Sequence, residues 1–413
     1  MRQTVWLTIA LFLVLAAGCA KQPRAAKKGG FQEDADFLSA RVGTVVLRDA
    51  SGARLVAVSP QLQGRVMTST ADGPSGLSFG WINRELISSG VNNPHINAFG
   101  GEDRFWLGPE GGQFSIFFKQ GDSFDLDHWF TPPPVNEEAF ETVEKSDAAV
   151  RFRKPMRLIN YSGTVFDLDV ERTVRLLDEK DLSGLGLSLP AGVRMVAFAS
   201  ENRVTNTGQA AWSKDTGLLS IWILGMFNPS PKTTIVVPFK PGPESELGPV
   251  VNDAYFGKVP PDRLKVSETG VIYFKGDGLY RSKIGIAPAR VRPFAGSWDA
   301  ENGVLTIVHL TVPEGATDYV NSMWQIQERP FAGDVVNSYN DGPAAPGAKP
   351  LGPFYELESS SPAAALKPGE SLTHVHTTIH LLGDRSALDA VAKAVLGAGL
   401  KDIEAAFAAG TGR

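Results

Sequence analysis

Short strand-like stretches recur from residue 40 almost to the end of the chain, and this recurrence constrains the fold more than any other feature. The chain holds 43 Gly and 28 Pro, which suits many short strands and turns better than long helices. The sequence therefore predicts an all-β chain. The stretches are rich in β-branched and aromatic residues and are bounded by turn residues; they are Arg41–Leu47, Gln113–Phe118, Val165–Leu177, Val193–Phe198, Leu218–Leu224, Thr233–Val237, Val271–Phe274, Leu305–Val312 and Leu372–Leu382.

Only the C-terminal region predicts substantial helix. In Ser386–Ala408 apolar residues recur at helical spacing, and Gly397 and Gly399 are expected to divide the segment into two pieces. Residues 37–41 predict at most a short turn before the first strand. We therefore expect one large β-domain over residues 37–383 and a short helical tail over residues 384–413.

The N-terminus has the pattern of an exported, lipid-anchored protein. A short positive start leads into the apolar run Val5–Leu15, and the small residues Ala16-Ala17-Gly18 precede Cys19, the only cysteine of the chain. The pattern resembles the lipobox of bacterial lipoproteins, with Ala16 where Leu is usual. We expect residues 1–18 to be a lipoprotein signal peptide and Cys19 to carry the lipid, palmitate included. The alternative is an ordinary signal peptide with an incidental cysteine.

Residues 19–36 predict a flexible tether to a membrane surface. They hold Lys21, Arg24, Lys27 and Lys28 among Pro and Gly residues, and such charge favours an anionic headgroup surface. Ala20 stands where many inner-membrane lipoproteins have an aspartate, so outer-membrane placement in a bacterial cell envelope is favoured. No later stretch is apolar enough to span a bilayer, and a chain with one cysteine forms no internal disulfide.

Composition and motifs exclude several classes of function. The net charge is −5, and positive and negative residues are interspersed. The sequence has no basic stripe, so a nucleic-acid partner is not expected. The chain holds no G-x-S-x-G, no phosphate-cradling glycine loop and no H-E-x-x-H. We predict no cofactor and no metal. The oligomeric state is left open.

Several segments together resemble the galactose mutarotase-like superfamily, which includes aldose 1-epimerases and carbohydrate-binding relatives. Gly100–Glu110 resembles a glycine, arginine, tryptophan, proline and glutamate stretch of that superfamily, and Glu201–Gly208 resembles its strand-end Asn-x-Gly. Tyr355–Glu358, followed by Leu366–Glu370, resembles its late glutamate strand and L-x-P-G-E turn. Asn337–Gly342 resembles an uncharacterised group of bacterial exported proteins. The resemblance implies a large antiparallel β-supersandwich and a carbohydrate ligand.

One departure from the superfamily bears directly on catalysis. Epimerases carry a histidine on the strand after Asn-x-Gly, but Leu218–Gly225 holds Trp222 and no histidine. Mutarotation needs a base on the anomeric hydroxyl and an acid on the ring oxygen, whereas tryptophan only stacks on a sugar face. We therefore expect sugar binding without standard mutarotase catalysis. Two alternatives stay open: an epimerase-type enzyme with a relocated acid, and a structural envelope lipoprotein without ligand.

Candidate acid–base residues come from two places. Glu356 and Glu358 point to one face of their strand because side chains alternate. The resemblance implies that the family's base comes from this strand, and which of the two glutamates it is stays open. His95 is the candidate replacement acid if it lines the same cleft as Arg104.

Candidate sugar-binding residues combine an aromatic platform with short polar side chains. Asn and Asp offer directional bonds to vicinal hydroxyls, and aromatic rings stack on a pyranose face. Arg281 and Lys283 share a strand face and could hold an acidic sugar, although surface salt bridges explain the pair equally well. Trp324 and Tyr339 could extend the platform. The predicted binding residues are Arg104, Trp106, Trp222, Arg281, Asn337, Asn340 and Asp341.

The last strand places His374, His376 and His380 on one face. The first two could chelate a transition metal together with a carboxylate from a neighbouring strand. A hairpin through Lys367–Glu370 would make that neighbour the strand of Glu356. Histidine is also a common polar filler of a half-exposed sheet, and this second interpretation is preferred.

Overall fold

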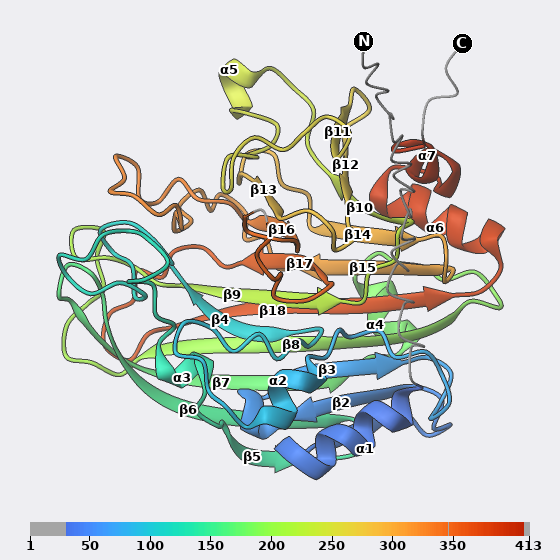
Figure 1. Ribbon diagram of the computed structural model, residues 1–413, viewed down its shortest axis with the longest axis horizontal. Coiled ribbons are helices and arrows are strands. Elements are labelled where there is room, and N and C mark those ends of the chain that lie inside the picture. The colour runs from blue at the N-terminus through green and yellow to red at the C-terminus, as the bar shows by residue number, and fades with distance from the viewer. Residues whose placement is uncertain (1–29, 346, 409–413) are drawn as a thin grey trace, which may run out of the picture.

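The computed structural model describes residues 30–345 and 347–408. Its strands form three sheets, and neighbouring strands within each sheet run antiparallel (Figure 1). The prediction of an all-β chain with short C-terminal helices is confirmed. The predicted signal peptide, Cys19 and the first part of the predicted tether lie outside the described residues.

The largest sheet has ten strands. Its long central strands show the period-2 alternation of a surface with one buried face, as in β7, where buried residues alternate with half-exposed ones. In spatial order the strands are β11 (Leu264–Ser267), β12 (Val271–Lys275), β10 (Thr233–Pro238), β14 (Phe294–Asp299), β15 (Val304–Leu310), β18 (Ser371–Leu382), β8 (Arg194–Asn206), β7 (Val165–Leu176), β6 (Ala149–Ile159) and β5 (Glu141–Lys145).

Two smaller sheets complete the β-structure. The five-stranded sheet carries strands that are buried along their whole length, such as β9. Its order is β13 (Ser282–Ile286), β16 (Val336–Asn340), β17 (Tyr355–Ser360), β9 (Ser220–Phe227) and β4 (Arg104–Gly108). The three-stranded sheet consists of β1 (Val45–Arg48), β2 (Leu55–Ser59) and β3 (Arg65–Thr70).

The five-stranded sheet packs face to face on the ten-stranded sheet. At one end Phe105 of β4 lies in the same apolar cluster as Phe166 of β7. At the other end Ile284 of β13 and Leu357 of β17 pack with Ile235 of β10. The five-stranded sheet therefore buries one face in the sandwich, which leaves its other face to form a site.

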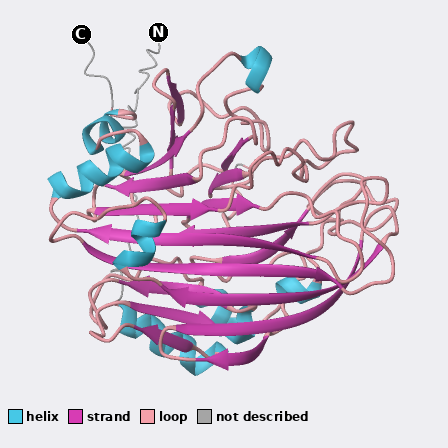
Figure 2. Cartoon of the chain, turned by 180° about the vertical axis from the view of Figure 1, so that it is seen from behind, coloured by secondary structure: helices cyan, strands magenta, loops and turns pink. Residues whose placement is uncertain are grey.

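Helices cover the edges and one outer surface of the sandwich. Leu388 and Ile403 of the C-terminal helices pack on Ile307 and Leu381 of the ten-stranded sheet, and Figure 2 shows the long strands of that sheet from behind. The helices are α1 (Phe31–Val42), a 3-10 helix (Pro60–Leu62), α2 (Arg84–Ser89), α3 (Pro133–Asn136), α4 (Glu179–Gly184), α5 (Glu244–Leu247), α6 (Arg385–Leu396) and α7 (Leu400–Ala405).

The expected division of the helical tail is confirmed at its glycines. Helix α6 begins after Asp384, whose side chain accepts a hydrogen bond from the Ser386 amide, and it ends at Gly397 with a φ of 73°. That left-handed conformation favours glycine because it has no Cβ. Helix α7 begins directly after Gly399.

The N-terminal part of the described chain differs from the prediction. Residues 31–36, predicted as tether, and residues 37–41, predicted as a turn, together form α1. The reason is packing: Phe31, Ala35 and Leu38 lie on one side of the helix and are buried with Met67 of β3. The segment 113–118 was also predicted wrongly as a strand. Phe117 and Phe118 there are buried in the core from a loop.

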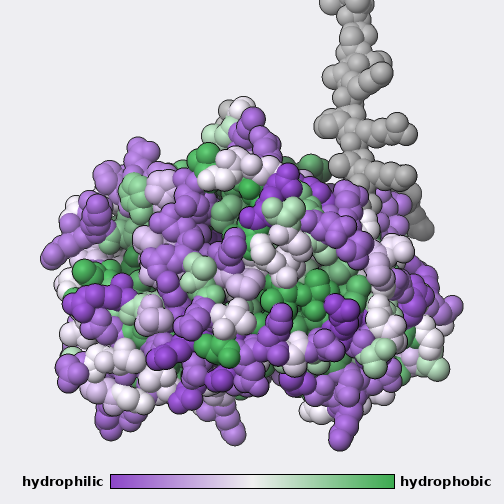
Figure 3. All heavy atoms as spheres, turned by 90° about the horizontal axis from the view of Figure 1, so that it is seen from below, coloured by the Kyte–Doolittle hydropathy of each residue, from purple (hydrophilic) through white to green (hydrophobic). Residues whose placement is uncertain are grey.

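One face of the molecule is mostly hydrophilic. Figure 3 shows one face on which polar and charged side chains predominate, with smaller hydrophobic areas between them. Strand β5 is exposed along its whole length. Within residues 30–345 and 347–408, no helix has the length and apolar character that crossing a bilayer requires.

Candidate functional site

The outer face of the five-stranded sheet presents alternate side chains from neighbouring strands. On β4, Arg104 and Trp106 point to this face, while Phe105 and Leu107 enter the core. The register places Trp106 opposite Trp222 of β9. This alternation brings polar and aromatic side chains from separate strands into one area.

On β17 the same alternation holds. Tyr355 and Leu357 pack in the core, while Glu356 lies opposite Met226 and Glu358 opposite Leu224 of β9. The prediction that the two glutamates share a face is therefore confirmed. Only Glu356 reaches the cavity; Glu358 lies fully buried behind the cavity wall.

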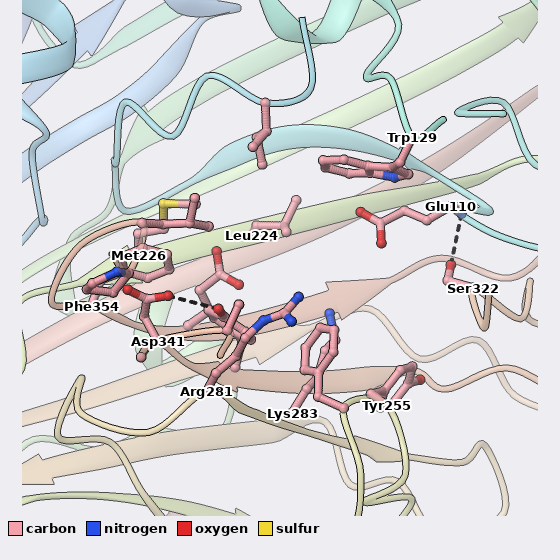
Figure 4. Close-up of a pocket in the computed structure, with 18 of the residues that line it drawn as sticks. Glu110, Trp129, Leu224, Met226, Tyr255, Arg281, Lys283, Ser322, Asp341 and Phe354 are labelled. Atoms are coloured by element: carbon pink, nitrogen blue, oxygen red, sulfur yellow. Dashed lines mark hydrogen bonds between the residues drawn. The ribbon is translucent and has the colours of Figure 1, made fainter. Parts of the chain in front are cut away.

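This face forms the floor of a cavity of about 440 Å³ (Figure 4). Loops that follow β4 and β16 and precede β13 build its walls. Such a layout, an apolar pocket with a few convergent polar groups, is usual for small-molecule sites. The aromatic lining residues are Trp106, Trp129, Trp222, Trp324, Tyr255, Tyr339, Phe256 and Phe354, and the polar ones include Arg104, Glu110, Arg281, Lys283, Ser322, Asp341, Lys349 and Glu356.

Lys283, Glu358 and Trp222 form a connected group in the wall. Lys283 Nζ lies 3.0 Å from Glu358 Oε2 and 4.6 Å from the centre of the Trp222 ring. The Trp222 indole N–H donates to the same Glu358 oxygen at 2.9 Å. Burial acts to lower the pKa of Lys283, but the charges of Glu358, Glu110 and Glu356 together outweigh burial, so the pKa is raised. Lys283 is therefore a cation whose charge is already matched.

Glu110 enters the cavity from the loop after β4. Its carboxylate accepts a hydrogen bond of 3.3 Å from the Trp106 indole, and its backbone amide donates to Ser322 Oγ at 3.2 Å (Figure 4). Burial raises the pKa of Glu110, against the opposing charge of Lys283 and with the repulsion of Glu358. The buried position therefore favours the protonated form of Glu110 more than an exposed position would.

Glu356 is the second carboxyl group that favours a proton. Burial raises its pKa well above the ordinary 4.5, and the like charge of Glu358 raises it further. Lys283 and Arg104 oppose this rise without cancelling it. Burial and the neighbouring Glu358 therefore favour the protonated form of Glu356, and in that form its carboxyl group can donate a hydrogen bond to a ligand.

Arg104 is fully buried beside these acids. Its guanidinium carbon lies 4.0 Å from the centre of the Trp106 ring, and Nη2 donates to the Val135 carbonyl at 3.3 Å. Burial lowers the pKa of Arg104 to about 9, against the opposing charges of Glu356 and Glu110. Arg104 still carries its charge at neutral pH.

The mouth of the cavity holds Asp341 and Arg281. The Tyr339 hydroxyl donates to Asp341 Oδ1 at 2.8 Å, and the Gly352 amide donates to Oδ2 at 2.8 Å. Arg281 stacks on Phe256, with its guanidinium carbon 3.8 Å from the ring centre. Figure 4 shows Arg281 and Lys283 side by side at the cavity.

The structure brings most of the predicted binding residues together. The predicted residues that line the cavity are Arg104, Trp106, Trp222, Arg281, Asp341 and Glu356. Trp324 and Tyr339 also line it, as the predicted aromatic platform requires.

Two predicted asparagines lie outside this cavity. Asn337 donates to the Tyr255 hydroxyl at 3.1 Å behind the wall. Asn340 accepts from the Gly278 amide at 2.8 Å and donates to the Tyr280 carbonyl at 2.9 Å. Both residues use their amides to hold the surrounding chain, so they do not face a ligand.

His95 does not line the cavity either. Its Nδ1 lies 2.6 Å from the Trp129 carbonyl, and its ring stacks on Phe130 with centres 4.5 Å apart. The condition for a replacement acid, a shared cleft with Arg104, is therefore not met. Loop packing explains this, because the segment around His95 supports Trp129 from outside.

The histidines of β18 lie between the sheets. β18 pairs with β15 and β8, so the expected hairpin with the strand of Glu356 is wrong. Instead β17 lies across the sandwich, where Ser359 Oγ is 2.7 Å from His374 Nε2 and 2.8 Å from His376 Nδ1. Burial lowers the pKa of His374 to about 3 and that of His376 to about 4. No group of three or more potential metal-binding side chains occurs in the described part of the chain.

Sequence reasoning missed several lining residues. Glu110 stands in the Gly100–Glu110 segment, but only the resemblance singled that segment out and no role was given to it. Trp129 and Tyr255 come from loops far from any motif, and no local pattern marks them. Their positions follow from loop packing alone.

Comparisons with known proteins address the fold. A putative aldose 1-epimerase from Escherichia coli K12 is 15% identical, with 82% of this chain and 98% of that chain covered and a TM-score of 0.47. A putative mutarotase from Salmonella typhimurium is 12% identical, with 83% and 90% covered and a TM-score of 0.46. A galactose mutarotase-like protein from Lactobacillus casei ATCC 334 is 12% identical, with 82% and 100% covered and a TM-score of 0.44. One of these three proteins is thus described as an aldose 1-epimerase, one as a mutarotase and one as galactose mutarotase-like.

A comparison with curated proteins finds no match. A family model described as a family of unknown function (DUF6786) matches residues 29–407. The match covers the β-sandwich, the cavity and the C-terminal helices. The chain therefore belongs to the DUF6786 family.

Proposed function

We propose that this protein binds carbohydrate in the cavity on the five-stranded sheet and does not catalyse standard aldose mutarotation. One observation carries the proposal: Arg104, Glu356 and Asp341 come from separate strands or their ends and converge on a cavity walled by tryptophans. The rings offer apolar faces to a pyranose, and the polar groups offer directional hydrogen bonds.

The polar groups are suited to a hydroxyl-rich ligand. Glu110 and Glu356 favour the protonated form and can donate and accept, while Arg104 donates only. Sugar hydroxyls both donate and accept, so they can bond to the carboxyl groups and to the guanidinium alike.

The absence of standard catalysis follows from Trp222. The indole N–H is already bonded to Glu358 and has no pKa usable for proton transfer near neutrality. Among the described residues, no histidine lines the cavity. Losing a general acid costs about 10²–10⁴-fold in rate.

A glycan array probed with the full-length chain in mild detergent tests the binding proposal. Trp324→Ala and Glu356→Gln should abolish or weaken array signals, and Arg292→Gln, an exposed change outside the cavity, should not. Binding that is unaffected by both cavity variants would place the ligand elsewhere.

Polarimetry with glucose and galactose tests the catalytic part. The protein should add little to the rate in buffer, and Glu358→Gln should weaken binding more than it changes any rate, because Glu358 orients Lys283 and Trp222. Rapid mutarotation by the wild-type protein would contradict this part of the proposal.

A second candidate function is an epimerase-type enzyme with a relocated acid. Glu110 favours it, since this residue is a carboxyl group that lines the cavity and burial raises its pKa, as a general acid requires. Mutarotation of an unusual sugar that Glu110→Gln abolishes would establish the enzyme. Binding of the same sugar without turnover would exclude it.

We also propose that the protein is anchored to the bacterial cell envelope, at the outer membrane, through a lipid on Cys19. The lone cysteine after Ala16-Ala17-Gly18 supports this proposal.

A further inference from the structure

We propose that the carbohydrate bound in this cavity is an acidic sugar, a uronic acid unit, and that the guanidinium of Arg281 binds its carboxylate at the cavity mouth. The inference rests on the proposed function, because it names the class of sugar that the same cavity takes.

Arg281 is held in place but has no polar partner. It is half-buried, lines the cavity and stacks on Phe256 with its guanidinium carbon 3.8 Å from the ring centre. Within the described part of the chain it forms no hydrogen bond and no ion pair. Stacking fixes the plane of the guanidinium while leaving its N–H groups free for a ligand.

The acidic side chain at the cavity mouth, Asp341, forms no ion pair with Arg281 in the described part of the chain. Asp341, the nearest acidic residue in sequence among the lining side chains, already accepts from the Tyr339 hydroxyl and the Gly352 amide, one bond on each oxygen. Lys349 also lines the cavity and, among residues 30–345 and 347–408, has no ion pair. The mouth therefore carries an excess of positive charge.

The structure separates the roles of Arg281 and Lys283, which share a strand face. Lys283 points into the wall and is matched by Glu358 at 3.0 Å. Arg281 stays at the mouth without an acid. The sequence alone allowed either a sugar-binding pair or a surface ion-pair arrangement. Of these two residues, Arg281 is the one that the structure leaves available to a ligand anion.

The remaining acids do not offset this charge. Glu110 and Glu356 interact with the charges of Arg104 and Lys283, and burial raises the pKa of both carboxyl groups. Arg104, whose pKa falls to about 9 through burial, stays charged there. A neutral sugar would leave the Arg281 fork unmatched, whereas a planar carboxylate accepts two parallel N–H bonds from it.

Titration calorimetry with the full-length chain in mild detergent tests the inference. Glucuronate and galacturonate should bind roughly tenfold or more tightly than glucose and galactose, as expected for a charge-assisted hydrogen-bonded pair. Arg281→Gln should remove this advantage, because it deletes both the charge and the planar guanidinium that would bind the carboxylate.

Two further variants sharpen the test. Arg281→Lys keeps the charge without the planar fork and should retain only part of the preference. Arg292→Gln is the matched control, since it removes one exposed arginine outside the cavity and should leave every affinity unchanged. Circular dichroism of each variant verifies that the fold is intact.

Each contrary outcome has a distinct meaning. Neutral sugars that bind as tightly as uronates, or a uronate preference that survives in Arg281→Gln, would overturn this inference and leave the proposed function standing. Tighter Arg281-dependent binding of the hexose 6-phosphates would overturn the carboxylate assignment. Binding of no sugar, acidic or neutral, would overturn the proposed function itself.

Discussion

Lys283 and Glu358 form an ion pair that crosses strand β16 between the strands that carry them. The glutamate is fully buried and the lysine nearly so. Buried charges have lost their hydration, so removing either partner would leave the other as an uncompensated charge in the interior and destabilise the fold. Glu358 also accepts a hydrogen bond from the Trp222 indole, so the ion pair helps to hold this ring in the cavity wall.

We predict that Lys283→Met lowers the free energy of unfolding by about 3–5 kcal/mol, because it leaves Glu358 buried without its counter-charge. Urea denaturation measures the loss. The exposed pair of Lys214 and Asp318 offers a control, and Lys214→Met should cost less than about 1 kcal/mol. The double variant Lys283→Met/Glu358→Gln should recover part of the stability. No recovery would contradict the electrostatic explanation.

Glu356 gives a prediction of pH dependence. Because its pKa is raised in the folded protein by burial and by Glu358, the folded state holds this proton more tightly than the unfolded state does. Its contribution to stability is therefore lost as pH rises above the ordinary value of 4.5 towards the raised pKa. Glu356→Gln, which cannot ionise, should gain stability relative to wild type as pH rises above 4.5. Denaturation at several pH values checks this, and a difference that stays constant would contradict it.

At the scale of elements, β4 and β17 show how much a strand's sequence predicts. In each, alternate residues face the cavity and the core, and the pairs Arg104 with Trp106 and Glu356 with Glu358 follow from that alternation. Alternation does not say which side chain ends in the cavity. Glu358 forms an ion pair with Lys283 of β13, which lies two strands away in the sheet, and does not reach the cavity.

Helix α1 shows the opposite case, in which an element was missed. Phe31, Ala35 and Leu38 have helical spacing, but charged residues and the glycines before them favoured a tether. Burial of this stripe against β2 and β3 decides the outcome, since short helices gain most of their stability from packing.

We predict that Leu38→Ala lowers the free energy of unfolding by about 2–5 kcal/mol, because Leu38 is fully buried between α1 and the three-stranded sheet. Ser39→Ala, at the adjacent exposed position, should change stability by no more than about 0.5 kcal/mol. Thermal denaturation of both variants measures the effect. Equal stabilities would mean that α1 does not belong to the folded core.

At the scale of the whole molecule, the anchoring proposal can be tested in cells. Cys19→Ala removes the only thiol, so the variant should lose palmitate labelling and accumulate as a released or unprocessed form. Membrane fractionation and metabolic labelling measure both effects. Ala20→Ser, which keeps the thiol, is the control. Unchanged labelling and fractionation of Cys19→Ala would refute lipid anchoring.

The sequence by itself determined the class of fold and part of the site. Period-2 alternation and frequent turn residues predict strands because both are local properties of the backbone. The same alternation, together with the resemblance, identified Arg104, Trp106, Trp222 and Glu356 as candidates, and all of them line the cavity.

Only the tertiary structure decided the rest, because strand order and loop packing depend on contacts between residues far apart in the chain. In the tertiary structure His374 and His376 lie between the sheets, where they contact Ser359. Asn340 contacts the Gly278 loop and does not face the cavity. The tertiary structure also brings Glu110 to the cavity from the loop after β4. Long-range packing decides which polar side chains pair with one another and which remain available to a ligand. The free-energy cost of burying an unpaired charge limits the possible arrangements.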